Sequence, residues 1–76
     1  MKRLQELKPG TKAIVLDVEG NATLRQKLLG MGLTKGAEVK VVRNAPLKDP
    51  IEIEVRGYHL SIRKAEAENV IVEVKE

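Results

Sequence analysis

Short aliphatic runs separated by glycine and proline dominate the hydrophobic pattern of this chain. Residues 12–18 are mostly β-branched and aliphatic, and residues 51–55 alternate strictly between apolar and acidic side chains. Alternation of this kind over about four to eight residues is typical of a strand with one buried face. The same criteria predict further strands at about residues 37–44, around Leu60 and Ile62, and at residues 70–74.

One segment follows helical spacing instead. Residues 22–30 come directly after Asn21, a favoured N-cap residue. Leu24, Leu28 and Met31 then recur at i, i+4 and i+7, which makes a single apolar stripe. We therefore predict one short helix between the first two strands, with a helical turn over residues 3–7 and a turn or loop over residues 65–69.

The hairpin after residues 51–55 allows a prediction of register. A two-residue loop at Gly57-Tyr58 keeps the apolar residues of both strands on one face, because side chains alternate between faces. Glycine at the first loop position suits a type II′ turn. This register pairs Val55 with Leu60, Ile53 with Ile62, and Glu52 with Arg63.

Length and cysteine content limit the fold. Seventy-six residues suffice for one small domain, which we place at residues 1–76. The chain lacks cysteine, which excludes disulfides, thiolate zinc sites and iron–sulfur clusters, so aliphatic packing must build the core. Five short strands in so short a chain predict a mainly β fold, a small closed or half-closed barrel.

Charge is unevenly distributed along the chain. Residues 1–48 contain ten Lys or Arg against four Asp or Glu, whereas residues 49–76 contain four against seven. Such asymmetry favours the encounter of the basic part of the chain with an acidic partner, although charged runs also form ordinary solvated faces. No stretch approaches the roughly 18 apolar residues of a membrane span, and no signal peptide is evident, so we expect a soluble, cytoplasmic domain.

The ordered motifs resemble those of one family. Residues 25–36, Arg-Gln-Lys-Leu-Leu-Gly-Met-Gly-Leu-Thr-Lys-Gly, are similar to the R-x-x-Leu-Leu-x-Met-Gly-Leu-x-x-Gly signature of FeoA domains. Residues 45–51, Ala-Pro-Leu-Lys-Asp-Pro-Ile, resemble the family's Ala-Pro-x-x-Asp-Pro-Ile loop. Pro9-Gly10, Gly57-Tyr58 and Val70-Ile71-Val72 follow in the family's order, so the likeness spans nearly the whole chain.

The resemblance to FeoA domains implies an SH3-like five-stranded barrel with one short helix between strands one and two and a short N-terminal helical turn. It implies an accessory role in ferrous iron uptake, with FeoB, a membrane permease with a cytosolic G-protein domain, as the partner that brings the domain to the membrane. Such domains also end DtxR-type metal-dependent repressors, but this chain shows no helix-turn-helix, which favours transport. The family is also associated with transition metal ion binding, although the repressors' metal ligands have no identifiable counterparts here.

The reactive side chains argue against catalysis. One histidine, no cysteine and no nucleophile–base pair leave no catalytic set, so we predict no enzyme and no cofactor. In the predicted register His59 faces outward across from Arg56, and a neighbouring cation disfavours a metal ligand. We therefore predict no metal-ligating residues.

Binding of RNA or DNA is the alternative function for a basic barrel. Phosphate contacts alone would have to carry it, because single-strand binding uses aromatic platforms and Tyr58 is the only aromatic residue. The same shortage counts against recognition of Pro-rich peptides. Docking onto a protein is therefore the main hypothesis.

Candidate docking residues lie on the helix and the 44–50 loop. Leu29 lies about 140° from Leu24 around a helix, off the apolar stripe. It either packs under the 44–50 loop or contacts a partner. In the second case the partner-binding residues are Leu29 with Arg25, Leu47, Lys48 and Met31, although the stripe position of Met31 also fits the core.

Overall fold

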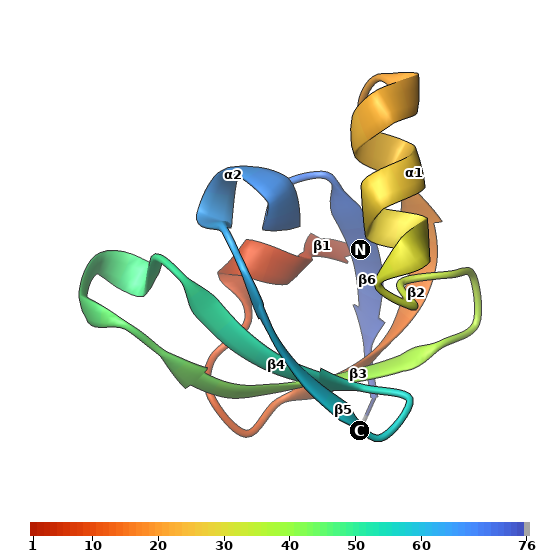
Figure 1. The fold of residues 1–76 in the computed structure, drawn as a ribbon. Helices are drawn as coiled ribbons and strands as arrows, with labels where there is room; N and C mark the ends of the chain where they lie inside the picture. The colour runs from red at the N-terminus through yellow and green to blue at the C-terminus, as the bar shows by residue number, and fades with distance from the viewer. Residues whose placement is uncertain (76) are drawn as a thin grey trace.

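The computed structural model describes residues 1–75, without the side chain of Lys48, and its fold is mainly β (Figure 1). The predicted strand ranges 12–18, 51–55 and 70–74 are confirmed. In chain order the elements are β1 (Lys2–Arg3), the 3-10 helix η1 (Leu4–Glu6), β2 (Lys12–Val18), α1 (Ala22–Gly30), β3 (Glu38–Asn44), the 3-10 helix η2 (Pro46–Lys48), β4 (Ile51–Val55), β5 (Tyr58–Ile62), α2 (Lys64–Ala67) and β6 (Val70–Val74).

The strands form one antiparallel sheet in the order β1-β6-β2-β3-β4-β5. The last strand returns to lie between β1 and β2, which joins the two ends of the chain. The sequence predicts five strands, and β1 is the additional one, because its two residues are too few to show a periodic pattern. Since β1 and β5 are the edges, no hydrogen-bonded strand pairing within residues 1–75 closes the sheet into a complete barrel.

The core lies on the inner face of this curved sheet. Inward residues alternate along the central strands, so that Ala13 and Val15 of β2 are buried while Lys12 is exposed. Leu4 of η1 and Leu28 of α1 complete the core from outside the sheet, and both are fully buried. Each Val, Leu or Ile side chain buried in this way contributes about 1.5–3 kcal/mol, which is the main stabilising term in a chain without disulfides.

The β4–β5 hairpin differs from the predicted register by two residues. Arg56 and Gly57 form the turn, with φ of 50° and 82°, the two positive values of a type I′ turn. A shift of two residues keeps the same faces, so alternation alone could not exclude it. The predicted register would set Lys64 opposite Ile51 on the buried face, whereas the observed one places a core isoleucine there. The observed pairs are Val55 with Tyr58, Ile53 with Leu60, Ile51 with Ile62 and Glu52 with Ser61.

Local hydrogen bonds define both ends of α1. The Asn21 side chain accepts a bond of 2.9 Å from the Leu24 backbone N–H at the N-terminus. Beyond the C-terminus, Gly32 adopts a φ of 95°, and the Leu33 N–H donates to the Leu28 carbonyl at 3.2 Å. This six-to-one bond is that of a Schellman motif, and it brings Leu33 into the core beside Leu28. The last turn of α1 is therefore fixed on the sheet.

Candidate functional site

The C-terminal end of α1 presents one buried and one exposed leucine in succession. Leu28 is 0% exposed, whereas Leu29 is 41% exposed. Met31 is half-buried and packs against the core, as its position in the stripe predicted. The Arg25 Nε donates to the Val18 carbonyl at 3.2 Å, which holds this exposed side chain against the end of β2. The end of α1 thus offers an apolar side chain to solvent from a rigid position.

The 44–50 loop presents a second exposed leucine far from the first. Leu47 is 92% exposed and has a φ of 63°, an unusual value for leucine. The side chain of Lys48 lies outside the described residues. Figure 1 shows that this loop and α1 project from opposite sides of the molecule. The structure therefore does not bring Leu47 beside Leu29, and Leu29 does not pack under this loop, because α1 precedes β3 whereas the loop follows it.

A hydrogen-bonded ion pair ties α1 to α2. The Lys27 ammonium donates to Glu66 Oε2, while Glu66 Oε1 accepts a 3.1 Å bond from the Arg63 backbone N–H. The bond from Lys27 is the main cause that holds the pKa of the Glu66 carboxyl below its usual value of 4.5. One carboxylate therefore both caps α2 and braces the helix that carries Leu29.

Acid should weaken this brace. A carboxyl whose pKa is lowered on folding stabilises the protein above its unfolded pKa, and that contribution is lost as the pH falls through the folded pKa. Glu66→Gln is expected to lower the free energy of unfolding by less than about 1 kcal/mol at neutral pH. Below pH 4.5, the free energy of unfolding of this variant should fall less steeply with decreasing pH than that of the parent chain. Urea unfolding at neutral and acidic pH checks this, with Glu73→Gln as control. Equal acid sensitivity of Glu66→Gln and the parent chain would contradict the role given to Glu66.

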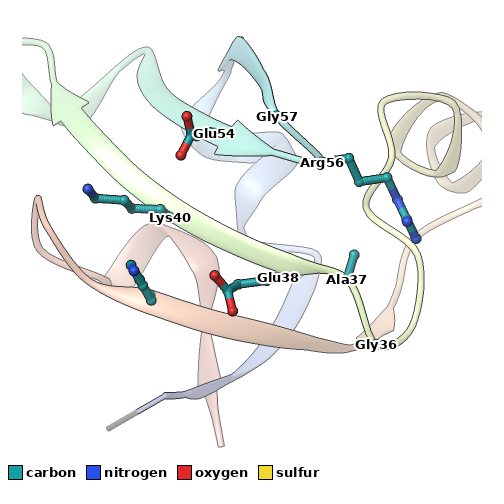
Figure 2. Close-up of a pocket in the computed structure, with 8 residues that line it drawn as sticks. Gly36, Ala37, Glu38, Lys40, Glu54, Arg56 and Gly57 are labelled. Carbon is teal, nitrogen blue, oxygen red and sulfur yellow. The ribbon is translucent and has the colours of Figure 1, made fainter.

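A charged groove of about 370 Å³ lies on the outer face of β2, β3 and β4 (Figure 2). Figure 2 shows Arg56 at the end near Gly36 and Lys40 toward the other end, with Glu38 and Glu54 on either side between them. The residues that line this β2–β4 groove are Lys12, Gly36, Ala37, Glu38, Lys40, Glu54, Arg56 and Gly57.

The carboxylates of the β2–β4 groove already have partners. Glu38 accepts a 2.6 Å bond from Lys75, which lowers the pKa of its carboxyl from the usual value of 4.5. Glu54 Oε2 lies 3.0 Å from His59 Nε2. By contrast, no carboxylate among the described residues lies within 4.0 Å of a Lys12, Lys40 or Arg56 side-chain nitrogen, so these three cations form no direct ion pair, although Lys12 contributes to the lowered pKa of the Glu38 carboxyl.

Strand register explains how these side chains come together. Lys12 lies directly opposite Lys40, Lys40 opposite Glu54, and Glu54 opposite His59, so one row crosses four strands. Sequence reasoning missed this row because it did not pair β2 with β3 and shifted the β4–β5 hairpin. The only usable signal was that Lys12, Lys40 and Glu54 occupy outward positions of their strands.

The described residues do not fit a resident metal ion. The prediction that His59 faces Arg56 is wrong, because the shifted register sets it opposite Glu54. These two side chains are a pair only, and residues 1–75 contain no group of three or more His, Cys, Asp or Glu able to hold a metal ion. A structural transition-metal site normally takes about four protein ligands.

Comparison with known proteins adds the following similarities. Residues 2–74 match the family model described as the FeoA domain. The chain is 38% identical over 72 residues to a Porphyromonas gingivalis protein named as a fusion of Fe(2+) transport protein A and the Fe(2+) transporter FeoB. The match covers 95% of this chain but only 8% of that protein, so the chain spans a small part of that relative.

Solved structures share the fold. A crystal structure of the iron uptake regulatory protein FeoA is 40% identical, with a TM-score of 0.87 over 96% of this chain and 95% of the other. FeoA of Stenotrophomonas maltophilia, complexed with zinc and described as a prokaryotic SH3 domain protein, is 30% identical, with a TM-score of 0.83 over 96% and 91%. The sheet described above is thus SH3-like. Within residues 1–75, no helix is long and apolar enough to cross a membrane.

Proposed function

The chain belongs to the FeoA family, and on that basis we propose that it is an accessory protein of ferrous iron uptake that binds the cytosolic part of a FeoB-type permease. The observation that carries the proposal is the Porphyromonas gingivalis relative, in which a segment similar to this chain and the transporter FeoB form one polypeptide. Two functions fused in one chain in one organism commonly act together as separate chains in another. The expected place of action is the cytoplasmic face of the membrane.

Docking rather than catalysis is the proposed mode of action. The exposed Leu29 at the fixed end of α1 is the proposed apolar contact, with Arg25 beside it on the helix and Met31 supporting it from the core. A bound accessory domain alters a permease only if it binds two of the permease's states with different affinity. The domain therefore modulates the activity or assembly of the permease by favouring one state.

Uptake of ferrous iron tests this function in cells. In cells whose ferrous iron enters only through the matching FeoB-type permease, removal of this chain should lower the initial rate of uptake, and the wild-type chain should restore it. Because the chain acts through contact, Leu29→Glu should fail to restore uptake at equal protein level. Uptake that is unchanged by removal of the chain would contradict the proposal.

A further inference from the structure

Three cations of the β2–β4 groove form no direct ion pair within the described residues, which favours an anionic occupant. Lys12 and Lys40 lie directly opposite each other on neighbouring strands, an arrangement of like charges that destabilises a sheet. At the far end Arg56 is held in place, because its Nη2 donates to Thr34 Oγ1 at 2.6 Å and its Nε to the Gly32 carbonyl at 3.4 Å. A carboxylate or phosphate between these groups would relieve the repulsion and gain charge-assisted hydrogen bonds.

We propose that the β2–β4 groove binds an acidic, extended segment of the permease's cytosolic part, with the segment's carboxylates placed against Lys12, Lys40 and Arg56. The inference rests on the proposed function, and it adds where the partner is held and by what chemistry. Charge complementarity favours this occupant, because Lys12, Lys40 and Arg56 line the groove against two carboxylates, one of which, Glu38, already forms an ion pair with Lys75.

The two carboxylates also distinguish a peptide from a phosphate. Glu38 and Glu54 flank the middle of the groove, where they would repel a compact, multiply charged phosphate group (Figure 2). An extended peptide can place carboxylates at the cationic ends and neutral residues between them, because successive side chains point to opposite sides. The separation of Lys40 from Arg56 thus fits a segment with spaced acidic residues.

The Arg56 end of the groove also adjoins the segment that follows α1, the helix that carries Leu29. Arg56 is hydrogen-bonded to Gly32 and Thr34, which directly follow α1. The segment directly after α1 therefore lies between the helix that carries Leu29 and the Arg56 end of the groove. A partner that covers Leu29 can extend an acidic segment into the groove without crossing the fold.

Charge substitutions in the groove test the inference. The double variant Lys12→Gln/Lys40→Gln should weaken binding to the permease's isolated cytosolic part on the order of tenfold and remove most of its salt dependence. Because it removes both the like-charge contact between Lys12 and Lys40 and the opposite-charge neighbour of Glu54, it should change the midpoint of thermal unfolding little. Lys64→Gln, which removes one positive charge on α2 away from the groove (Figure 1), is the control and should leave affinity unchanged.

The outcomes separate this inference from the proposed function. Binding that is lost with Leu29→Glu but unchanged in the groove variant would overturn the inference and leave the proposed function standing. If the wild-type chain does not bind the permease's cytosolic part, the proposed function fails. A fluorescent peptide of alternating glutamate and serine then tests separately whether the groove binds an acidic, extended segment. Peptide binding that the groove variant loses supports the site. No peptide binding, or displacement of the peptide by inorganic phosphate at lower concentration than by free peptide, overturns it.

Discussion

Leu28→Ala is expected to lower the free energy of unfolding by about 2–5 kcal/mol, the range for deletion of a fully buried leucine side chain. Leu28 is 0% exposed and is the only buried residue of α1. A chain of 76 residues has a total stability of roughly 4–11 kcal/mol at typical values per residue. The variant should therefore be partly unfolded well below the melting temperature of the parent chain.

Urea unfolding followed by circular dichroism measures this loss. Leu29→Ala is the matched control, since it makes the same chemical change one residue further along the helix at a side chain that is 41% exposed. We expect the control to cost less than about 1 kcal/mol, as surface changes usually do. Equal losses at the two positions would show that α1 does not pack through Leu28.

Leu29→Glu is expected to have the opposite profile, with binding to the permease's cytosolic part weakened on the order of 100-fold and the fold retained. A partner that covers Leu29 must bury an apolar group, and a carboxylate at that point would be desolvated without a counter-ion. In the free chain the same glutamate stays in solvent, so stability should change by less than about 1 kcal/mol.

Two neighbouring variants separate charge from apolar contact. Leu29→Gln removes the apolar side chain without adding charge and should also weaken binding, although less. Gln26→Glu adds the same charge on an exposed position of the same helix and should change affinity little. If Gln26→Glu weakens binding as much as Leu29→Glu does, general repulsion would explain the effect and Leu29 would lose its proposed role.

The strands were predictable where the sequence alternates over a full element. Residues 51–55 show strict period-two patterning and form β4 as predicted. The register between β4 and β5 was not predictable, because alternation fixes which face of the sheet each side chain lies on and a shift of two residues leaves that face unchanged. Arg56 in a left-handed conformation was the specific obstacle, since such a position costs a non-glycine residue about 1 kcal/mol and sequence reasoning assigns it to glycine.

The candidate site shows the same limit. Helical geometry places Leu29 off the buried stripe, a property of one helix that spacing alone reveals. The distance of Leu47 from Leu29 depends on how β3 and β4 carry their connecting loop away from α1, which no local pattern reports. The β2–β4 groove likewise joins Lys12, Lys40 and Arg56 through strand pairing between distant segments. Tertiary arrangement, rather than residue type, decides which charges meet.

Titration of the labelled chain with the isolated cytosolic part of the matching FeoB-type permease is the direct test of whether the domain docks onto the permease. We expect saturable binding that weakens with rising salt and that Leu29→Glu weakens on the order of 100-fold, measured with and without guanine nucleotide. Absence of saturable binding to the cytosolic part under either condition, with both proteins folded, would contradict docking onto the permease.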